Sequence, residues 1–201
     1  MRWFWIDRFD AFVRAKSGSA VKNVSLSEDH LHDHFPGYAV MPNSLVVEGM
    51  AQTGGLIVAD AIKFQKRVVL AKVSAAQFHR DAVPGDTILF DAKVLDLKPA
   101  GSLVHVTTRI ADRSAARTDD GAPRAGEGVP QGEAELFFAH IDPGEGVPLL
   151  FEPEQFVRWL SQMRMYDIGV DEQGNRLEPP WASETVVSAF NGGMTGAGTF
   201  K

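Results

Sequence analysis

The sequence predicts an α+β fold in which a curved antiparallel sheet wraps around one long helix. The first observation is that residues 44–63 carry apolar side chains all around a helical axis, and not along one face only. The second is that four candidate strands follow in succession, separated by turns that contain proline or glycine. A helix that is apolar on every side must be buried by other parts of the chain. A single sheet that curls around the helix buries most of its surface with few secondary-structure elements.

The helix predicted for residues 44–63 has a polar start, because Asn43 or Ser44 can accept hydrogen bonds from the unpaired amides of a first turn. At helical rise its length is about 30 Å. Glu48, Gln52 and three glycines interrupt the apolar run of residues 44–62. We therefore expect a buried helix of a soluble protein and not a membrane span.

Five segments are predicted to be strands. Residues 20–27 precede the helix and alternate moderately between apolar and polar side chains. Four more follow the helix, and their turns favour antiparallel neighbours. These four candidate strands are residues 68–76, 86–97, 102–111 and 132–141.

The main domain is expected to cover residues 1–147, with residues 1–15 packed against its core. Residues 112–132 contain almost no large apolar side chain, which predicts a long surface loop within the last hairpin. Residues 148–201 form a predicted C-terminal extension. Its residues 153–166 have apolar side chains at helical spacing, and its last twelve residues, with four glycines, predict a poorly ordered tail.

Composition narrows the class of protein further. The chain has 201 residues, of which 44% are hydrophobic, enough for one sizeable core. It contains no cysteine, which excludes disulfides and a thiol nucleophile and favours a reducing compartment. The first residues do not resemble a signal peptide, so we expect a cytoplasmic protein. The net charge of −6 argues against nucleic acid as the main partner.

The residues that carry chemistry are His34 and Glu48, fourteen positions apart. His34 lies in an irregular segment, and neutral imidazole accepts protons near working pH. Glu48 lies in an otherwise apolar helix, where burial favours its protonated form and suits it to act as an acid. Taken alone, a loop histidine is usually a surface residue, but a glutamate in a dry helix points to function.

A metal site formed by His30, His32, Asp33 and His34 is a less favoured alternative. Alternate residues of an extended segment can share a face, but adjacent ones do not easily bind one ion.

Residues 34–52 read HFPGYAVMPNSLVVEGMAQ, and residues 78–86 read FHRDAVPGD. The first resembles H-F-P-G-x-P-V-M-P-G-V-L-x-x-E-A-M-A-Q, and the second F-R-R-P-V-x-P-G-D, of the FabZ-type β-hydroxyacyl-acyl-carrier-protein dehydratases. The likeness covers roughly residues 3–141, and residues 148–201 have no recognised counterpart. The chain departs from the pattern where Asn43 replaces a glycine, Gly49 an alanine, and Ala39 and Asp81 prolines.

The resemblance implies a hotdog fold and the dehydration of 3-hydroxyacyl thioesters in fatty acid biosynthesis. In this reaction His34 would take a proton from C2, and Glu48 would protonate the departing C3 hydroxyl. Backbone amides at Asn43 and Ser44, at the positive end of the helix, would stabilise charge on the thioester oxygen. Two supporting residues are expected. They are Gly37, in the turn after His34, and Gln52, one helical turn after Glu48, which would orient Glu48 or hold a water.

An acyl tunnel is expected to be lined by Phe35, Met41, Leu45 and Phe78, although core packing is an equal alternative for each of them. The family uses no metal or other cofactor, since its substrate is carried on the phosphopantetheine arm of acyl carrier protein or on coenzyme A.

The resemblance also implies a homodimer, possibly a trimer of dimers, with each site shared between two subunits. An acidic acyl carrier protein as partner predicts a basic patch at the tunnel mouth, with Arg80 and Lys72 as candidates. Two alternatives stay open, namely a hydratase or thioesterase acting on coenzyme A thioesters, and a non-catalytic acyl-chain binding protein.

Overall fold

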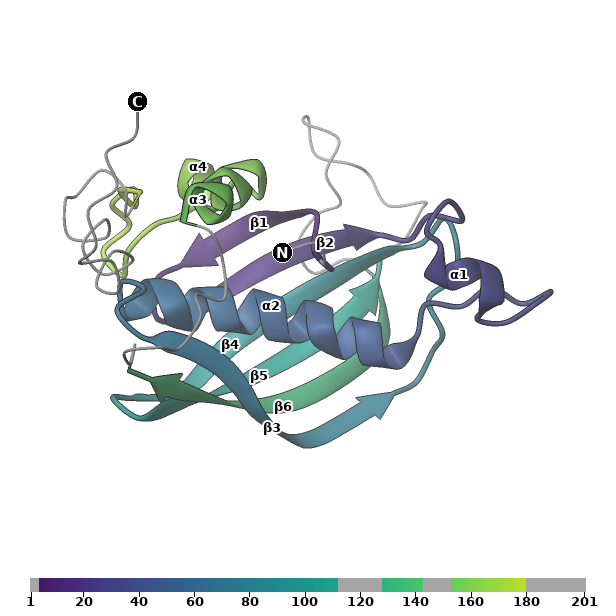
Figure 1. Ribbon diagram of the computed structural model, residues 1–201, viewed down its shortest axis with the longest axis horizontal. Coiled ribbons are helices and arrows are strands. Elements are labelled where there is room, and N and C mark those ends of the chain that lie inside the picture. Colours follow the sequence, from purple (N-terminus) through teal and green to yellow (C-terminus); the bar gives the residue numbers. More distant parts are fainter. Residues whose placement is uncertain (1–3, 112–127, 143–152, 180–201) are drawn as a thin grey trace, which may run out of the picture.

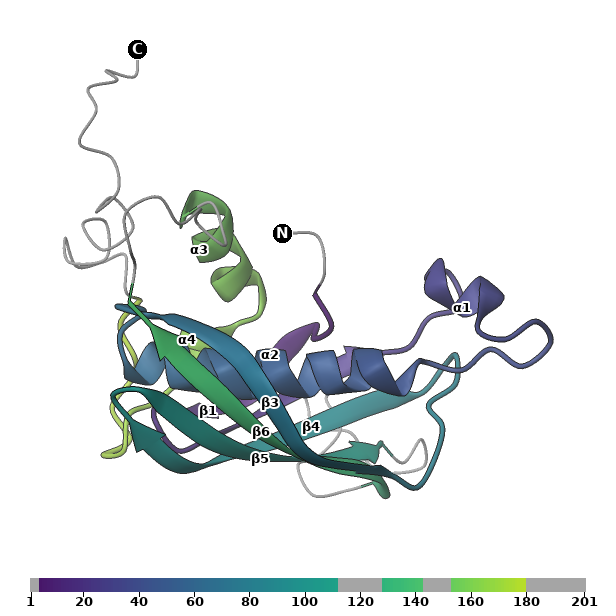
Figure 2. The same ribbon diagram turned by 60° about the horizontal axis from the view of Figure 1, so that its bottom comes forward.

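The computed structural model describes residues 4–111, 128–142 and 153–179. A six-stranded antiparallel sheet curves around the long helix α2, Asn43–Ala61, which runs along its concave face (Figures 1 and 2). The predicted α+β class and the wrapped helix are therefore confirmed. None of the helices in the described ranges is both long and apolar enough to cross a membrane.

The strands follow one another in the sheet in the order β1-β2-β4-β5-β6-β3. They are β1, Arg8–Val13; β2, Ser17–Asn23; β3, Arg67–Phe78; β4, Thr87–Lys98; β5, Gly101–Ile110; and β6, Val129–Ile141. All five predicted strands are present. β6 begins inside the segment predicted as a surface loop, and most of that loop, residues 112–127, lies outside the described residues.

Strand β1 was not foreseen, and its pairing explains why. Phe9 and Phe12 are both buried although they are three positions apart, which is not the spacing of a regular strand. The register against β2 shifts between Phe9 and Ala11, and this bulge turns both rings toward the core.

The turn before β4 does not make a hairpin with β3. β4 pairs with β2 and β5, while β3 pairs with β6 and forms one edge of the sheet, so the expectation that β3 and β4 are neighbours is wrong. The Val83–Asp86 turn itself is present, since the Asp86 amide donates to the Val83 carbonyl. However, this turn is bonded to Val24, the residue after β2. The Gly85 amide donates to the Val24 carbonyl, and the Val24 amide donates to the Asp86 carbonyl.

Helix α2 begins at Asn43 with Pro42 as its N-cap, and no side chain caps it, so the predicted capping by Asn43 or Ser44 is wrong. The helix lies close to the sheet at Gly49. A Cβ atom added there would lie 2.6 Å from Cζ of Phe90 and 3.0 Å from the carbonyl oxygen of Trp5. The ring of Phe90 therefore occupies the space that a side chain at position 49 would need.

The C-terminal segment, residues 153–179, contains α3, Pro153–Gln162, and α4, Met165–Ile168. The single helix predicted for residues 153–166 is wrong, because Arg164 adopts a left-handed backbone with φ of 59° and separates the two helices. This segment lies beside β1 (Figure 1), where the Phe9 amide donates to the Met163 carbonyl at 2.8 Å. The boundary at 147/148 stays a prediction, and the glycine-rich tail lies outside the described residues.

Candidate active site

His34 follows the short helix α1, His30–Asp33, and begins a tight turn. Phe35 and Tyr38 exchange two backbone hydrogen bonds of 2.9 Å. Gly37 has φ of 80°, a conformation that glycine adopts without the strain of a side chain. Its place in the turn is thus observed, and its supporting role stays a prediction.

The ring of His34 is half-buried and has a fixed orientation. Its Nδ1 lies 3.0 Å from the carbonyl oxygen of Val40, and the Val40 amide donates to the His34 carbonyl at 2.9 Å. A carbonyl oxygen only accepts hydrogen bonds, so the neutral ring that makes this contact carries its proton on Nδ1. Its Nε2 then presents a lone pair, which is the form that a general base requires.

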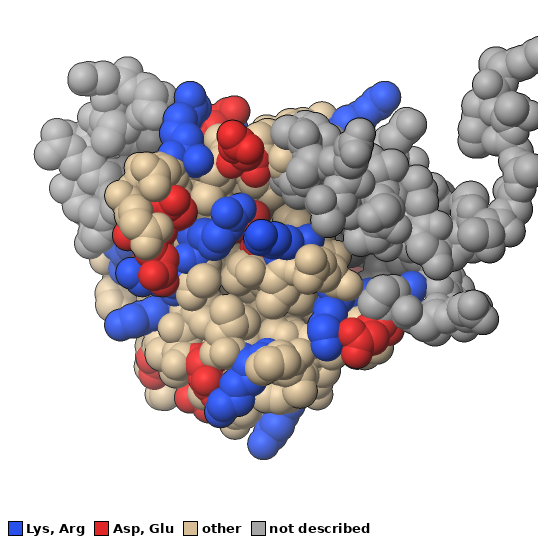
Figure 3. Space-filling model, turned by 90° about the vertical axis from the view of Figure 1, so that its left-hand side faces the viewer, with Lys and Arg blue, Asp and Glu red and all other residues tan. Residues whose placement is uncertain are grey.

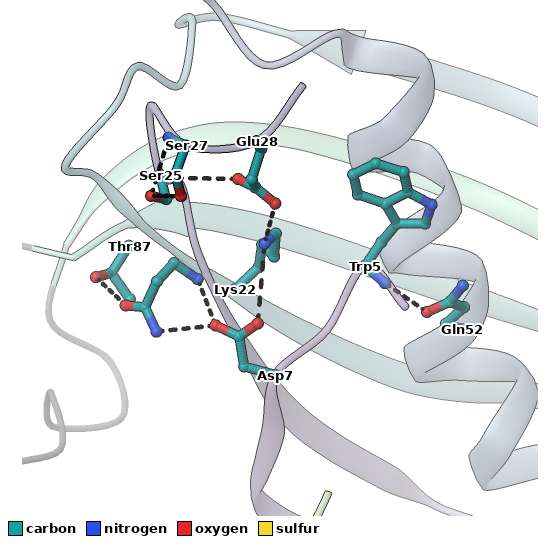
Figure 4. A network of polar contacts seen from close by, with 9 residues as sticks. Trp5, Asp7, Lys22, Ser25, Ser27, Glu28, Gln52 and Thr87 are labelled. Atoms are coloured by element: carbon teal, nitrogen blue, oxygen red, sulfur yellow. Dashed lines mark hydrogen bonds and ion pairs between the residues drawn. The ribbon is translucent and has the colours of Figure 1, made fainter. Parts of the chain in front are cut away.

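Glu48 is half-buried one turn into α2 and is contacted by Gln52. Nε2 of Gln52 donates to Oε1 of Glu48 at 3.0 Å. Oε1 of Gln52 accepts from the backbone amide of Trp5 at 2.9 Å (Figure 4). The predicted contact between Gln52 and Glu48 is present. The carboxamide of Gln52 is thus bonded at both ends, to Glu48 through its nitrogen and to Trp5 through its oxygen.

The start of α2 presents free backbone donors. The amides of Leu45 and Val46 both bond to the carbonyl of Pro42. Those of Asn43 and Ser44 have no acceptor among residues 4–111, 128–142 and 153–179, and both residues are exposed. An oxyanion site at this point fits the structure, and it stays a prediction.

The structure brings the candidate residues to one end of α2 without joining all of them. Within the described chain, the side chains of His34 and Glu48 share no hydrogen bond or ring contact. They are linked through Val40, Met41 and Pro42, which connect the His34 turn to the helix.

The four predicted tunnel residues differ in their surroundings. Met41 is buried in the core, whereas Leu45 and Phe78 are partly buried against it. Phe35 is 56% exposed and stacks on His34 with 4.1 Å between ring centres. Whether they line a tunnel stays a prediction.

An ion-pair network around the buried Lys22, near the His34 segment, was not found by sequence reasoning. Nζ of Lys22 lies 2.6 Å from Glu28 and 3.8 Å from Asp7 (Figure 4). Burial acts to raise the pKa of Glu28, but hydrogen bonds from Lys22 and from the Ser25 amide outweigh it, and the pKa is lowered. The network ties β2 to the loop that leads into α1.

His30, which leads the same helix, packs edge-on against Trp5 at 5.0 Å between ring centres. Burial lowers its pKa, and its Nε2 has no hydrogen-bond partner among the residues that the structure describes. Nε2 of His32 contacts the carbonyl of Leu26 instead, and His34 contacts Val40. Within the part of the chain that is described, no three carboxylate or histidine side chains are placed to share a metal ion.

Basic side chains gather at the end of the molecule where α2 ends, and acidic ones lie among them (Figure 3). Several are paired there, including Arg14 with Asp60 and Lys66 with Asp142. This end is roughly 28 Å from the start of α2 at helical rise. Lys72 and Arg80 are exposed on and after β3, and a basic patch around them stays a prediction.

Comparisons with known proteins agree with this description. The model of the FabA-like domain family matches residues 5–114. The 3-hydroxyacyl-[acyl-carrier-protein] dehydratase FabZ of Granulibacter bethesdensis is 40% identical over 93 residues, which are 45% of this chain and 55% of that protein. The FabZ of Listeria monocytogenes is 34% identical over 96 residues, 47% of this chain and 67% of that protein. The chain thus spans between about half and two thirds of the length of these relatives.

The fold has a solved counterpart in the smu.793 protein of Streptococcus mutans, determined with acetyl CoA bound. The two share 14% identity over 72% of this chain and 96% of that one, with a TM-score of 0.50. At this identity the likeness concerns the fold alone, and it agrees with the hotdog arrangement of sheet and helix. Since the family model covers more than half of the residues, this chain is a member of the FabA-like domain family.

Proposed function

We propose that this protein is a cytoplasmic homodimer that dehydrates 3-hydroxyacyl thioesters to trans-2-enoyl thioesters, with His34 as base and Glu48 as acid. The orientation of His34 carries the proposal, because its contact with Val40 leaves Nε2 as the proton acceptor. The names of the FabZ relatives specify substrates linked to acyl carrier protein, which supports the same substrate class here.

In the proposed reaction Nε2 of His34 removes a proton from C2 of the substrate. The electron pair forms the C2–C3 double bond as the C3–O bond breaks, and the hydroxyl leaves as water with a proton from Glu48. Charge that develops on the thioester oxygen is stabilised by the amides at the start of α2. Proton exchange with solvent then restores neutral His34 and protonated Glu48.

Two observations support a site shared between subunits. The side chains of His34 and Glu48 share no hydrogen bond within the described residues of one chain. Strand β3 is an edge strand of 12 residues, and residues 71–77 are exposed along it. A long exposed edge that contains apolar side chains such as Val73 is where a second chain can pair.

The deciding experiment follows the loss of enoyl absorbance as a crotonyl thioester is hydrated, the reverse of the proposed reaction. We expect turnover by the wild type and its loss in His34→Ala and Glu48→Gln. His32→Ala is the matched control, because His32 is an exposed neighbour that contacts Leu26. Equal rates in all four proteins would refute the assignment. Release of free thiol without loss of the double bond would indicate a thioesterase, and tight binding without turnover a binding protein.

Sharing of the site is tested by mixing the two inactive variants and allowing subunits to exchange. A mixed dimer then contains one complete site and one site that lacks both groups. At random exchange, half of the dimers are mixed and half of their sites are complete, so about a quarter of wild-type activity should return. No recovery, with exchange verified by mass, would place both groups within one subunit.

A further inference from the structure

We propose that Trp159 of α3 and Phe4 of the N-terminal segment are positioning residues for Glu48, which they hold through hydrogen bonds of Trp5 and Gln52. This inference rests on the proposed role of Glu48 as the acid. It assigns a part in the reaction to the C-terminal segment, which lies outside the residues matched by the family model.

The path consists of three contacts. The rings of Trp159 and Phe4 meet edge to face with 4.6 Å between their centres and 71° between their planes. The next residue, Trp5, donates its backbone amide to Oε1 of Gln52 at 2.9 Å, and Gln52 donates to Glu48 at 3.0 Å. The helix α3 is thereby connected with the acid through short contacts alone.

The orientation of the Gln52 carboxamide is the reason why this path matters. Its NH₂ and C=O ends are nearly equal in size, so packing alone does not choose between them. The Trp5 amide can only donate, and it therefore holds the C=O end and turns the NH₂ end toward Glu48. Oε1 of Glu48 is then an acceptor, and the transferable proton belongs on the other oxygen, Oε2.

Asp7 is fixed to β2, because its amide donates to the Val21 carbonyl at 2.6 Å, and Phe4 and Trp5 lie before this anchor. Ring contacts hold them from two directions. Phe4 packs against Trp159, while the buried ring of Trp5 packs against His30 of α1. Removal of the Trp159 ring leaves Phe4 without this support and should allow the Trp5 amide to move away from Gln52.

The test compares Trp159→Ala with Phe156→Ala, a matched control three residues earlier in α3. Phe156 also makes an edge contact, but with Phe64 at 5.5 Å, which lies outside the path. We expect Trp159→Ala to lower kcat for crotonyl thioester hydration about tenfold, because small displacements of a reacting group are costly, with KM changed less than about twofold. Phe156→Ala should keep kcat within about twofold, and Trp159→Phe should restore most of the loss.

A second readout does not depend on activity. Hydrogen exchange of the Trp5 backbone amide, followed by NMR, should accelerate at least about tenfold in Trp159→Ala and stay unchanged in Phe156→Ala. The inference is overturned if Trp5 exchanges at the wild-type rate in Trp159→Ala, or if both variants accelerate it equally. Wild-type protein that does not hydrate the thioester refutes the proposed function, whereas the exchange measurement still decides whether Trp159 holds Trp5.

Discussion

Arg14, in the turn between β1 and β2, donates two hydrogen bonds to the carboxylate of Asp60 near the end of α2. Its Nε lies 2.7 Å from Oδ2 and its Nη2 lies 3.1 Å from Oδ1. The hydroxyl of Tyr166 in α4 donates a third hydrogen bond at 3.2 Å. Burial, together with the charge of Asp60, raises the pKa of Tyr166 far above its ordinary value, so its hydroxyl stays protonated and donates.

Arg14→Met should lower the free energy of unfolding by about 2–4 kcal/mol, because Asp60 is 1% exposed and the change removes the partner of its buried carboxyl group. Urea unfolding of the single and double variants measures this. The double variant Arg14→Met/Asp60→Leu should recover most of the loss, since it replaces the ion pair with apolar contacts. If the losses of unfolding free energy in the two single variants add up in the double variant, the two residues are not coupled.

Gly49→Ala should destabilise the protein although alanine favours helices by about 1 kcal/mol over glycine. The new methyl group meets the ring of Phe90, and we expect a net cost of about 1–3 kcal/mol from overpacking. The companion change Phe90→Leu makes room, so the double variant Gly49→Ala/Phe90→Leu should be more stable than Gly49→Ala. Thermal unfolding of the four proteins checks this. A stabilised Gly49→Ala would contradict the close packing of α2 on β4.

Unfolding should become easier as the pH falls below about 7, in part because of His140. This side chain is buried in β6 and burial lowers its pKa below the ordinary 6.5. Below pH 6.5 the unfolded chain therefore binds a proton that the folded protein does not, and stability is lost as the pH falls. His140→Gln should show a smaller loss of unfolding free energy between pH 7.5 and 5.5, as measured by urea titrations.

Two outcomes distinguish titration of His140 from loss of its contact. Ser102→Ala removes the hydroxyl that lies 3.2 Å from Nε2 of His140, and it should lower stability without reducing the pH dependence. The pH dependence that remains in His140→Gln is assigned in part to His30, whose pKa burial also lowers. If the unfolding free energy of His140→Gln depends on pH as strongly as that of the wild type, His140 does not contribute to the pH dependence.

Val73→Lys should weaken the proposed dimer, because Val73 is 41% exposed on the edge strand β3 and two added lysines would repel one another across a paired edge. Leu95→Lys is the control, since Leu95 is 51% exposed but lies on β4 in the interior of the sheet. Sedimentation velocity should show monomers for the first variant only, and its activity should fall with dissociation. If both variants sediment as the wild type does, β3 is not the interface.

Strong local patterns made part of this structure predictable. Residues 44–63 were predicted as a covered helix because apolar side chains surround their axis, and α2 has that position. His34 and Glu48 stood out because their residue types and spacing resemble a family. In contrast, β1 was missed because a bulge at Phe9 breaks the alternation.

Features that depend on long-range contacts had no signal of their own. The turn at Val83–Asp86 looks like a hairpin turn, yet its partners lie after β2, and β3 therefore pairs with β6. The side chain of Gln52 is oriented by the backbone amide of Trp5. Every residue except proline has such an amide, so the sequence does not mark this contact. In the sequence Gly49 is only a departure from the family pattern, whereas the close approach of Phe90 to this position is visible in the folded structure alone.

The two outer strands of the sheet differ in what they offer to another chain. β1 and the turn that follows it already exchange backbone hydrogen bonds with the C-terminal segment, at Phe9, Phe12 and Arg14. β3 has its outer side exposed. Two copies joined along β3 would form one continuous sheet with a sealed β1 at each end. Growth by strand addition would then stop at two chains, so the C-terminal segment would act as a terminator that protects the protein from open-ended polymerisation.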